Sequence, residues 1–413
     1  MREESVRILD KIWDRLSRLG APFIFLWIIM FTVVFSDALS YPAIPYLVKE
    51  FLLEELAVVA MIGFLSSIFS AVKIAANILV AFLGDKTDRN IIILITLAFL
   101  PPSFALLLFA RNHLWILGSY MLFGIFYGAL IPPLNAMVAD LAQRENRGTL
   151  FAIFNLSWII SQIVAPMLGG FLSDTISLRF PIIPSLALSL AIFILFIIFR
   201  GILRGVASLS RLVSDKYEDA RTPIKTLLFL CLIQIFSGLG SGVLAVVATA
   251  FLVYVIGASP TEIGLTYSLS WGIATAVSQI PGGRLSDRFG SRSIMAASTL
   301  ISAPLLMLLP FSRSLIHYIL ISALSFLIGN LSSPAFSAWV ATLMRRQLWS
   351  KGFGLTSASF SIGSVVGPII GSLTWAAFKP NYLIPFSIST EFILLTTPFI
   401  AVLKEHKGDT QQP

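Results

Sequence analysis

The sequence predicts an all-α membrane protein with twelve transmembrane helices in two pseudo-symmetric six-helix bundles. Three observations lead to this prediction: an apolar composition, the placement of the positive charges and an internal repeat. Of the 413 residues, 57% are hydrophobic and only 12% are charged, whereas soluble domains are about 25% charged. Twelve spans of about 20 residues need about 240 apolar positions, which is close to the number present. A sizeable soluble catalytic domain is therefore excluded.

Twelve apolar runs are long enough to cross a bilayer. They cover residues 21–48, 57–83, 90–110, 113–138, 148–173, 180–200, 223–256, 260–283, 293–312, 314–342, 351–378 and 381–403. The pairs Pro101-Pro102 and Pro132-Pro133 interrupt two of these runs. We expect kinks there, because proline removes a backbone hydrogen bond from the helix.

The positive charges predict the orientation of the chain. With both termini placed inside, 23 of the 29 Lys and Arg residues fall in inside segments and five in outside loops. The positive-inside rule then predicts cytoplasmic N and C termini in the cytoplasmic (plasma) membrane. Residues 1–20 have no apolar core typical of a signal peptide, and their basic, amphipathic pattern predicts a helix on the membrane surface. We therefore expect membrane lipids as partners, and no nucleic acid.

The two halves of the chain repeat at a nearly constant offset. Gly84 and Asp88 match Gly283 and Asp287 at 199 residues, Ile62-Gly63 matches Ile263-Gly264 at 201, and Ala165-Pro166 matches Gly367-Pro368 at 202. The predicted organisation is an amphipathic N-terminal helix at 1–20, a bundle at 21–200, a basic linker at 201–222, a second bundle at 223–404 and a tail at 405–413. Parallel six-span repeats around a central site are a transporter design.

A short motif follows the second span of each half. The C-terminal copy reads Gly283-Arg-Leu-Ser-Asp287-Arg288-Phe-Gly290-Ser-Arg292, and the first copy keeps Gly84, Asp88 and Arg89. With twelve spans and positive inside loops, these motifs make the chain resemble the major facilitator superfamily. The fifth span, with Ala165-Pro166-Met-Leu-Gly169-Gly170, is similar to an element of that family's drug and metabolite efflux branch.

The resemblance implies roles for both sets of residues. It implies conformational gating by Gly84, Asp88, Arg89, Gly283, Asp287 and Arg288, with Asp88 meeting the N-terminus of the eleventh span. A second set is expected to act as a helix-packing hinge, or in packing alone: Pro166, Gly169, Gly170, Gly363, Gly367 and Pro368. One departure concerns coupling, because the family's proton antiporters carry an Arg where Tyr120 precedes Gly124 here.

Three ionisable residues lie within the predicted spans: Asp37, Lys73 and Glu391. Such a residue costs about 2.5–3.5 kcal/mol at the centre of a membrane helix, so each is a candidate for proton coupling or for binding substrate charge. For Asp37 the alternatives are an ion pair with Lys73 or a spectator exposed to the cavity. A pairing role is favoured for Lys73, and Glu391 lies on a span that the resemblance places at the bundle periphery.

Polar and aromatic residues within the spans predict a substrate cavity. Asn155, Trp158 and Gln162 recur at i, i+3 and i+7 and so share one helix face. The other candidates for the lining are Asn135, Gln234, Trp271, Gln279 and Asn330. Such a lining suits amphipathic organic solutes, although each amide has interhelical hydrogen bonding as its alternative role.

These observations predict a secondary active transporter that moves a small organic solute by alternating access, through proton-coupled efflux of lipophilic or amphipathic compounds. The alternatives are proton-coupled uptake of a small organic solute or anion, with Lys73 as countercharge, and a non-transporting membrane sensor. An enzyme is not expected, because the sequence offers no pattern of a nucleophile with a base and no metal-ligand cluster. Carboxylates in the spans and the lack of a nucleotide-binding loop favour a proton gradient as the energy source. With three His and one Cys, no metal site or cofactor is expected. The expected partners are a small-molecule substrate and protons, and we expect a monomer.

Overall fold

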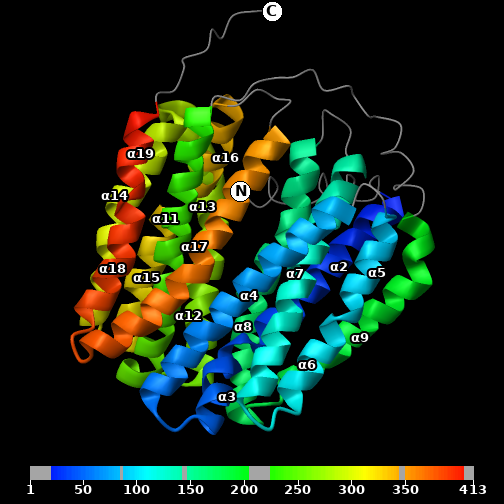
Figure 1. Cartoon of the computed structure of the whole chain (residues 1–413), viewed down its shortest axis with the longest axis horizontal. Helices are drawn as coiled ribbons and strands as arrows, with labels where there is room; N and C mark the ends of the chain where they lie inside the picture. The colour runs from blue at the N-terminus through cyan, green and yellow to red at the C-terminus, as the bar shows by residue number, and fades with distance from the viewer. Residues whose placement is uncertain (1–19, 84–86, 142–146, 204–223, 344–348, 404–413) are drawn as a thin grey trace, which may run out of the picture.

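The computed structural model describes residues 20–83, 87–141, 147–203, 224–343 and 349–403, and all of its secondary structure there is helical (Figure 1). Within these ranges, eleven helical segments are long and apolar enough to cross a membrane. The twelfth crossing is the continuous helical stretch from Pro260 to Phe289, which is rich in Ser, Thr and Gly. The predicted fold class is therefore confirmed. The predicted surface helix, most of the basic linker and Gly84 lie outside the described residues.

The N-terminal half contains the first six spans. Its elements are α2 (Gly20–Ser40), the 3-10 helix η1 (Tyr41–Ala43), α3 (Ile44–Phe51), α4 (Glu55–Leu83), α5 (Arg89–Ala98), α6 (Leu100–Leu108), α7 (His113–Leu141), α8 (Arg147–Thr175), α9 (Ile182–Phe199) and the 3-10 helix η2 (Arg200–Leu203).

The C-terminal half contains the last six spans. Its elements are α11 (Ile224–Phe251), the π-helix η4 (Leu252–Ile256), α12 (Pro260–Thr266), the π-helix η5 (Tyr267–Ile273), α13 (Ala274–Phe289), α14 (Ser291–Leu306), the 3-10 helix η6 (Leu309–Phe311), α15 (Leu315–Gly329), α16 (Ser332–Leu343), α17 (Trp349–Phe378), α18 (Leu383–Leu394) and α19 (Thr396–Val402).

The two proline pairs behave differently. The third span is interrupted at Phe99, between α5 and α6, so that Pro101 and Pro102 fall in the first turn of α6, where proline is tolerated. In contrast, α7 continues through Pro132 and Pro133 without interruption. The first pair therefore coincides with an interruption of its span, and a kink of α7 at the second pair stays a prediction.

Equivalent helices take equivalent positions in the two halves. In the N-terminal half α2 packs against α8 and α9, and in the C-terminal half α11 packs against α17 and α18. Because lipid is as apolar as the side chains, such helices associate mainly through close packing. Phe251 and Phe386 illustrate this between α11 and α18, with their ring centroids 5.6 Å apart.

Two of the contacts between the halves are related to one another by the sequence repeat. A Cβ added at Gly63 of α4 would lie 2.7 Å from the carbonyl oxygen of Pro368 on α17, and one added at Gly264 of α12 would lie 2.2 Å from that of Pro166 on α8. The sequence repeat pairs Gly63 with Gly264 and Pro166 with Pro368. Glycine is thus required at both crossings, because any side chain would push the two backbones apart.

The remaining glycines of the predicted hinge also lie at close helix contacts. A Cβ at Gly169 would approach the carbonyl oxygen of Leu39, and one at Gly170 would approach that of Pro260 across the interface. Gly363 and Gly367 lie in the same way against the backbone of α11. Close packing therefore accounts for all four glycines, and a hinge at these positions stays a prediction.

The hydrogen bonds of Tyr46 and Asp174 and the ion pair of Glu55, all of which join the two halves, lie at one end of the molecule. This is the end where α3 is found, at the bottom of Figure 1, and we call it the α3 end. There the Tyr46 hydroxyl donates to the carbonyl oxygen of Ala258. The molecule is therefore fastened at the α3 end.

Candidate functional site

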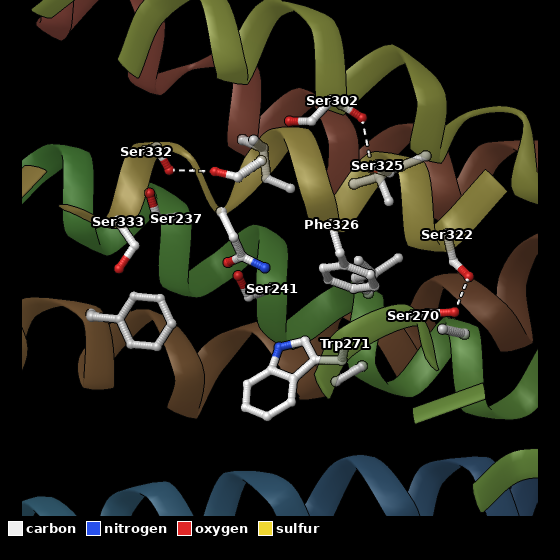
Figure 2. Close-up of a pocket in the computed structure, with 18 of the residues that line it drawn as sticks. Ser237, Ser241, Ser270, Trp271, Ser302, Ser322, Ser325, Phe326, Ser332 and Ser333 are labelled. Atoms are coloured by element: carbon white, nitrogen blue, oxygen red, sulfur yellow. Dashed lines mark hydrogen bonds between the residues drawn. The ribbon is translucent and has the colours of Figure 1, made fainter. Parts of the chain in front are cut away.

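A cavity of about 930 Å³ lies between the halves and extends into the C-terminal half. Thirty of its 35 lining residues come from the C-terminal half, and Figure 2 shows part of that wall. The N-terminal half contributes Asp37, Ala38, Tyr41, Gln162 and Pro166. The volume is in the range of small-molecule sites.

Among the residues that the structure describes, Asp37 is the one charged residue that lines the cavity. It lies near the end of α2, one turn before the chain leaves the helix at Ser40. Its Oδ2 accepts a hydrogen bond of 2.8 Å from the hydroxyl of Tyr127 on α7. A carboxylate in this position is held by one donor and leaves other lone pairs for a ligand.

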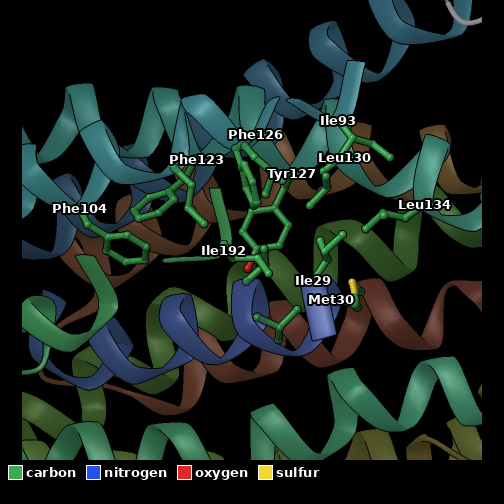
Figure 3. Packing of buried hydrophobic residues seen from close by; sticks show 14 of the residues in the cluster. Ile29, Met30, Ile93, Phe104, Phe123, Phe126, Tyr127, Leu130, Leu134 and Ile192 are labelled. Atoms are coloured by element: carbon green, nitrogen blue, oxygen red, sulfur yellow. The ribbon is translucent and has the colours of Figure 1, made fainter. Parts of the chain in front are cut away.

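Tyr127 reaches Asp37 because α4 and α7 pack closely. A Cβ at Gly128 would lie 2.2 Å from the carbonyl oxygen of Lys73, and one at Gly124 would lie 2.8 Å from that of Phe69, also on α4. Figure 3 shows Tyr127 beside Phe123 and Phe126, across from α2. The sequence analysis missed Tyr127. The available signal was its position seven residues after Tyr120, on the same helix face within an apolar span.

Lys73 does not pair with Asp37. Within the described residues Lys73 forms no ion pair, and its Nζ lies 5.9 Å from the ring centroid of Phe69. That ring in turn lies edge-on to Tyr127, with centroids 5.8 Å apart. Lys73 is also absent from the cavity lining. Of the roles left open for Lys73, the ion pair with Asp37 is therefore wrong for this conformation.

Glu391 points away from the cavity. It is exposed on α18, whereas Ile393, two residues further on, lines the cavity. Residues two apart on a helix lie on nearly opposite sides. Ser389 faces the bundle as well, since its hydroxyl donates to the Gly240 carbonyl at 2.9 Å. The suggested place of Glu391 in the central path is therefore not supported.

The predicted amide and tryptophan lining divides into two groups. Gln162, Gln234, Trp271 and Asn330 line the cavity, whereas Asn135, Asn155, Trp158 and Gln279 do not. On α8, Asn155 is exposed and Trp158 packs against the core of the N-terminal half. Of the three predicted residues on this face of α8, only Gln162 lines the cavity, together with Pro166 one turn further on, because the cavity reaches one end of that face and not its whole length.

Hydroxyl groups, which the sequence analysis did not single out, dominate the lining. The cavity wall includes ten serines, three threonines and three tyrosines, nearly all from the C-terminal half. Figure 2 shows Ser237, Ser241 and Ser333 on the side of the cavity where α11 and α16 meet. The serines are scattered over five spans and give no local pattern in the sequence, so only the folded chain brings them together.

The two copies of the motif differ from each other in local structure. Asp88 accepts a hydrogen bond of 2.9 Å from the backbone N–H of Asn90 and so caps its own helix, α5. Arg89 forms an ion pair with Asp140 of α7. The helix of the eleventh span begins at Trp349, but the side chains of its first three residues are outside the described part of the structure, so the contact expected between this helix start and Asp88 stays a prediction.

In the C-terminal copy, Gly283, Asp287 and Arg288 belong to α13 and not to a loop, which corrects the sequence-based placement. The helix ends two residues later than Asp287, at Phe289. Gly290, with φ of +86°, supplies the positive φ that favours a helix stop. Asp287 and Arg288 are exposed on the last turn, and their predicted gating role stays untested.

Two carboxylates of the N-terminal half fasten the α3 end to the C-terminal half. Glu55 accepts a hydrogen bond of 3.0 Å from the indole N–H of Trp375 and pairs with Lys379. Asp174 accepts 2.7 Å and 2.9 Å bonds from the Ser259 hydroxyl and the Thr261 backbone N–H, which adds an acid to the N-terminus of α12. The sequence analysis missed both carboxylates because they lie in short end regions far apart in the chain.

Glu55→Ala is expected to open the α3 end. The substitution removes an ion pair and an indole hydrogen bond, worth together about 1–2 kcal/mol, so the ratio of closed to open molecules falls by roughly 5- to 30-fold. Spin labels at Leu53→Cys and Phe311→Cys, in a Cys231→Ser background, measure the separation of the halves at that end. The distance distribution should gain a longer component.

Glu50→Ala is the matched control for this prediction. The Glu50 carboxylate pairs with Arg179 at 2.8 Å within the N-terminal half, so its removal leaves the contact between the halves intact. Equal distance distributions for Glu55→Ala and the parent protein would show that Glu55 does not hold the two halves together.

Comparison with known proteins relates the whole chain to one family. The family profile described as Major Facilitator Superfamily matches residues 26–228 and 230–410. Multidrug resistance protein 1 of Bacillus subtilis (strain 168) is 24% identical over 362 residues, covering 87% of this chain and 90% of that protein. Quinolone resistance protein NorA of Staphylococcus aureus (strain MSSA476) is 22% identical, covering 93% and 96%.

Solved structures share the fold at low identity. A bacterial homolog of the human lysosomal transporter Spinster, in an inward-facing and occupied conformation, superposes with a TM-score of 0.69 at 16% identity, covering 93% of this chain and 96% of that one. The peptide transporter POT in complex with sulfate gives 0.70 at 12% identity, covering 92% and 93%.

Proposed function

Because the chain belongs to the Major Facilitator Superfamily and is therefore an integral membrane transporter of small molecules, we propose that it exports lipophilic or amphipathic cations in exchange for protons. The observation that carries this proposal is the charge of the cavity. Asp37 alone is charged among the described residues that line it. In an environment of low dielectric, that carboxylate attracts a cation far more strongly than it would in water.

The position of Lys73 argues against the alternative of anion uptake. An anionic solute would need a cation in the cavity wall, and Lys73 lies outside the lining with its ammonium group near the Phe69 ring. An anion would instead meet the like charge of Asp37. The cation is therefore the better match to the cavity.

Exchange with protons follows from the cost of an unpaired charge in the membrane. When the cationic substrate leaves, the Asp37 carboxylate loses its countercharge, and binding a proton removes that cost. The same group then holds either substrate or proton, and not both. Such a site gives antiport without a second ionisable residue.

The direction of transport is inferred from the positive-inside rule together with the relatives. With the basic linker in the cytoplasm, the fastened α3 end faces outward and the cavity is accessible from inside. The relatives reported above carry names of drug resistance, which favours export. We place the protein in the cytoplasmic membrane on the same grounds.

Flux in inverted membrane vesicles tests the proposal. Tetraphenylphosphonium, a permanent cation without hydrogen-bonding groups, should accumulate in inverted vesicles with an acidic lumen and should leak back when the pH gradient is collapsed. Vesicles without the protein are the control. Accumulation only in right-side-out vesicles would favour uptake, and binding without accumulation in either orientation would indicate a sensor.

A further inference from the structure

We propose that the C-terminal half holds a polar recess that binds an uncharged hydrogen-bonding part of the substrate, at a distance from the charge at Asp37. The inference rests on the proposed function and narrows its substrate class. The substrate would be a monocation that also carries hydroxyl, carbonyl or amide groups. A purely apolar cation would use only part of the site.

The first observation is a polar stripe on an otherwise apolar helix. Gln234, Ser237 and Ser241 recur at i, i+3 and i+7 on α11 and all three line the cavity. None of these side chains forms a hydrogen bond within the described residues. Ser333 of α16 faces the same space (Figure 2) and its hydroxyl is also without a partner. These groups are available to a ligand.

The second observation lies deeper in the half. Tyr318 and Ser302 are only 3% and 7% exposed, yet both line the cavity and neither hydroxyl forms a hydrogen bond within the described part of the chain. Buried polar groups normally have partners because an unpaired one costs free energy. A ligand or water in the recess would supply the missing partner.

Neighbouring hydroxyls show what a purely structural role looks like. The Ser270 and Ser322 hydroxyls bond to each other at 2.7 Å and join η5 to α15, and the Ser325 hydroxyl donates to the Ser302 carbonyl at 2.9 Å and joins α15 to α14. These bonds hold the walls of the recess. The fold therefore uses these three hydroxyls and leaves those of Tyr318 and Ser302 open to the cavity.

The composition of the lining indicates what kind of group the recess can bind. Leu252, Leu306 and Phe326 lie among the hydroxyls of the lining, so the recess offers apolar contact on some sides and hydrogen bonds on others. This combination suits an aromatic or cyclic group that carries hydroxyl or carbonyl substituents. The described residues of the C-terminal half that line the cavity include no charged side chain, so a second charge on the ligand would have no partner among them.

The test compares two cationic probes on purified protein in detergent. Tetraphenylphosphonium has no hydrogen-bonding group, whereas doxorubicin is an amine cation with several hydroxyl and carbonyl groups. Tyr318→Phe combined with Ser302→Ala should weaken doxorubicin binding by roughly 3- to 10-fold and leave tetraphenylphosphonium binding within about two-fold, as expected when only hydrogen bonds are lost. Ser237→Ala combined with Ser241→Ala should also weaken doxorubicin binding selectively. This second variant replaces the first in the test if the Tyr318→Phe, Ser302→Ala protein does not fold.

Matched controls separate the recess from general effects of mutation. Tyr254→Phe also removes an unpartnered tyrosine hydroxyl, and Ser364→Ala removes a hydroxyl that donates to the Phe360 carbonyl; neither residue lines the cavity. This control pair should change neither affinity. If the recess variants weaken both probes equally, or weaken neither, the recess inference is wrong.

The same experiment also tests the proposed function itself, which is cation binding at Asp37. Asp37→Asn should weaken both probes, because both are cations. If the parent protein binds neither probe, or if Asp37→Asn changes neither affinity, cation binding at Asp37 is wrong and the recess inference falls with it. Loss of both probes in Asp37→Asn together with unchanged doxorubicin binding in the recess variants would overturn the recess alone.

Discussion

Asp37→Asn is expected to abolish pH-driven accumulation of tetraphenylphosphonium and to weaken its binding by about 10- to 100-fold, since an interaction with a charged group is worth about 1.5–3 kcal/mol. Asparagine keeps the size of the side chain, and its carbonyl oxygen still accepts the hydrogen bond from Tyr127. The variant loses only the charge and the ability to exchange a proton. Binding is measured by equilibrium titration and accumulation in inverted vesicles.

Glu391→Gln is the matched control for this substitution. It makes the same acid-to-amide change within a membrane span, but Glu391 is exposed on α18 and does not line the cavity. Its accumulation of tetraphenylphosphonium should equal that of the parent protein. Undiminished accumulation by Asp37→Asn, or equal losses in both variants, would remove Asp37 from the proposed mechanism.

Gly264→Ala is expected to abolish transport by preventing closure of the α3 end. The added methyl group would lie 2.2 Å from the Pro166 carbonyl oxygen, which is backbone and cannot rotate away. Overpacking of this kind costs about 1–3 kcal/mol, so the closed form loses roughly 5- to 150-fold in population. The spin-label pair at Leu53→Cys and Phe311→Cys should report a wider α3 end.

Gly354→Ala provides the matched control, because a Cβ at that position meets no atom within 4 Å. Both variants insert one methyl group into a membrane helix, so a general effect on insertion or stability appears in both. Gly63→Ala, at the repeat-related crossing with Pro368, should behave like Gly264→Ala. Normal closure in Gly264→Ala would show that the halves tolerate a wider crossing and that this contact does not limit closure.

The fold was predictable because it depends on features that a sequence displays locally. Apolar runs of the length of a bilayer and charges at their ends are visible without any neighbour in space. The sequence repeat also contained information on the interface between the halves. The helices of the two halves cross at residues that the repeat pairs with one another: Gly63, Pro166, Gly264 and Pro368. Glycine recurs at both crossings because its lack of a side chain lets the two backbones touch.

The site was less predictable because it depends on which helix faces meet. A serine in a membrane span can satisfy its hydroxyl by donating to its own helix, as Ser364 does to the Phe360 carbonyl away from the cavity, so the presence of a serine does not indicate a cavity. Tyr127 and Asp37 are 90 residues apart, and no local pattern joins them. On α18, Glu391 lies two residues before Ile393, which lines the cavity. The sequence does not show which face of this helix turns inward, because packing against the neighbouring helices determines it.

Proton release on substrate binding tests the central claim most directly. In weakly buffered detergent solution, saturating tetraphenylphosphonium should displace a proton from the parent protein, with Asp37 as its source. The same addition to Asp37→Asn should release none, while Glu391→Gln should match the parent. Binding of the cation to the parent protein without any proton release, across the physiological pH range, would contradict an exchange of substrate and proton at one carboxylate.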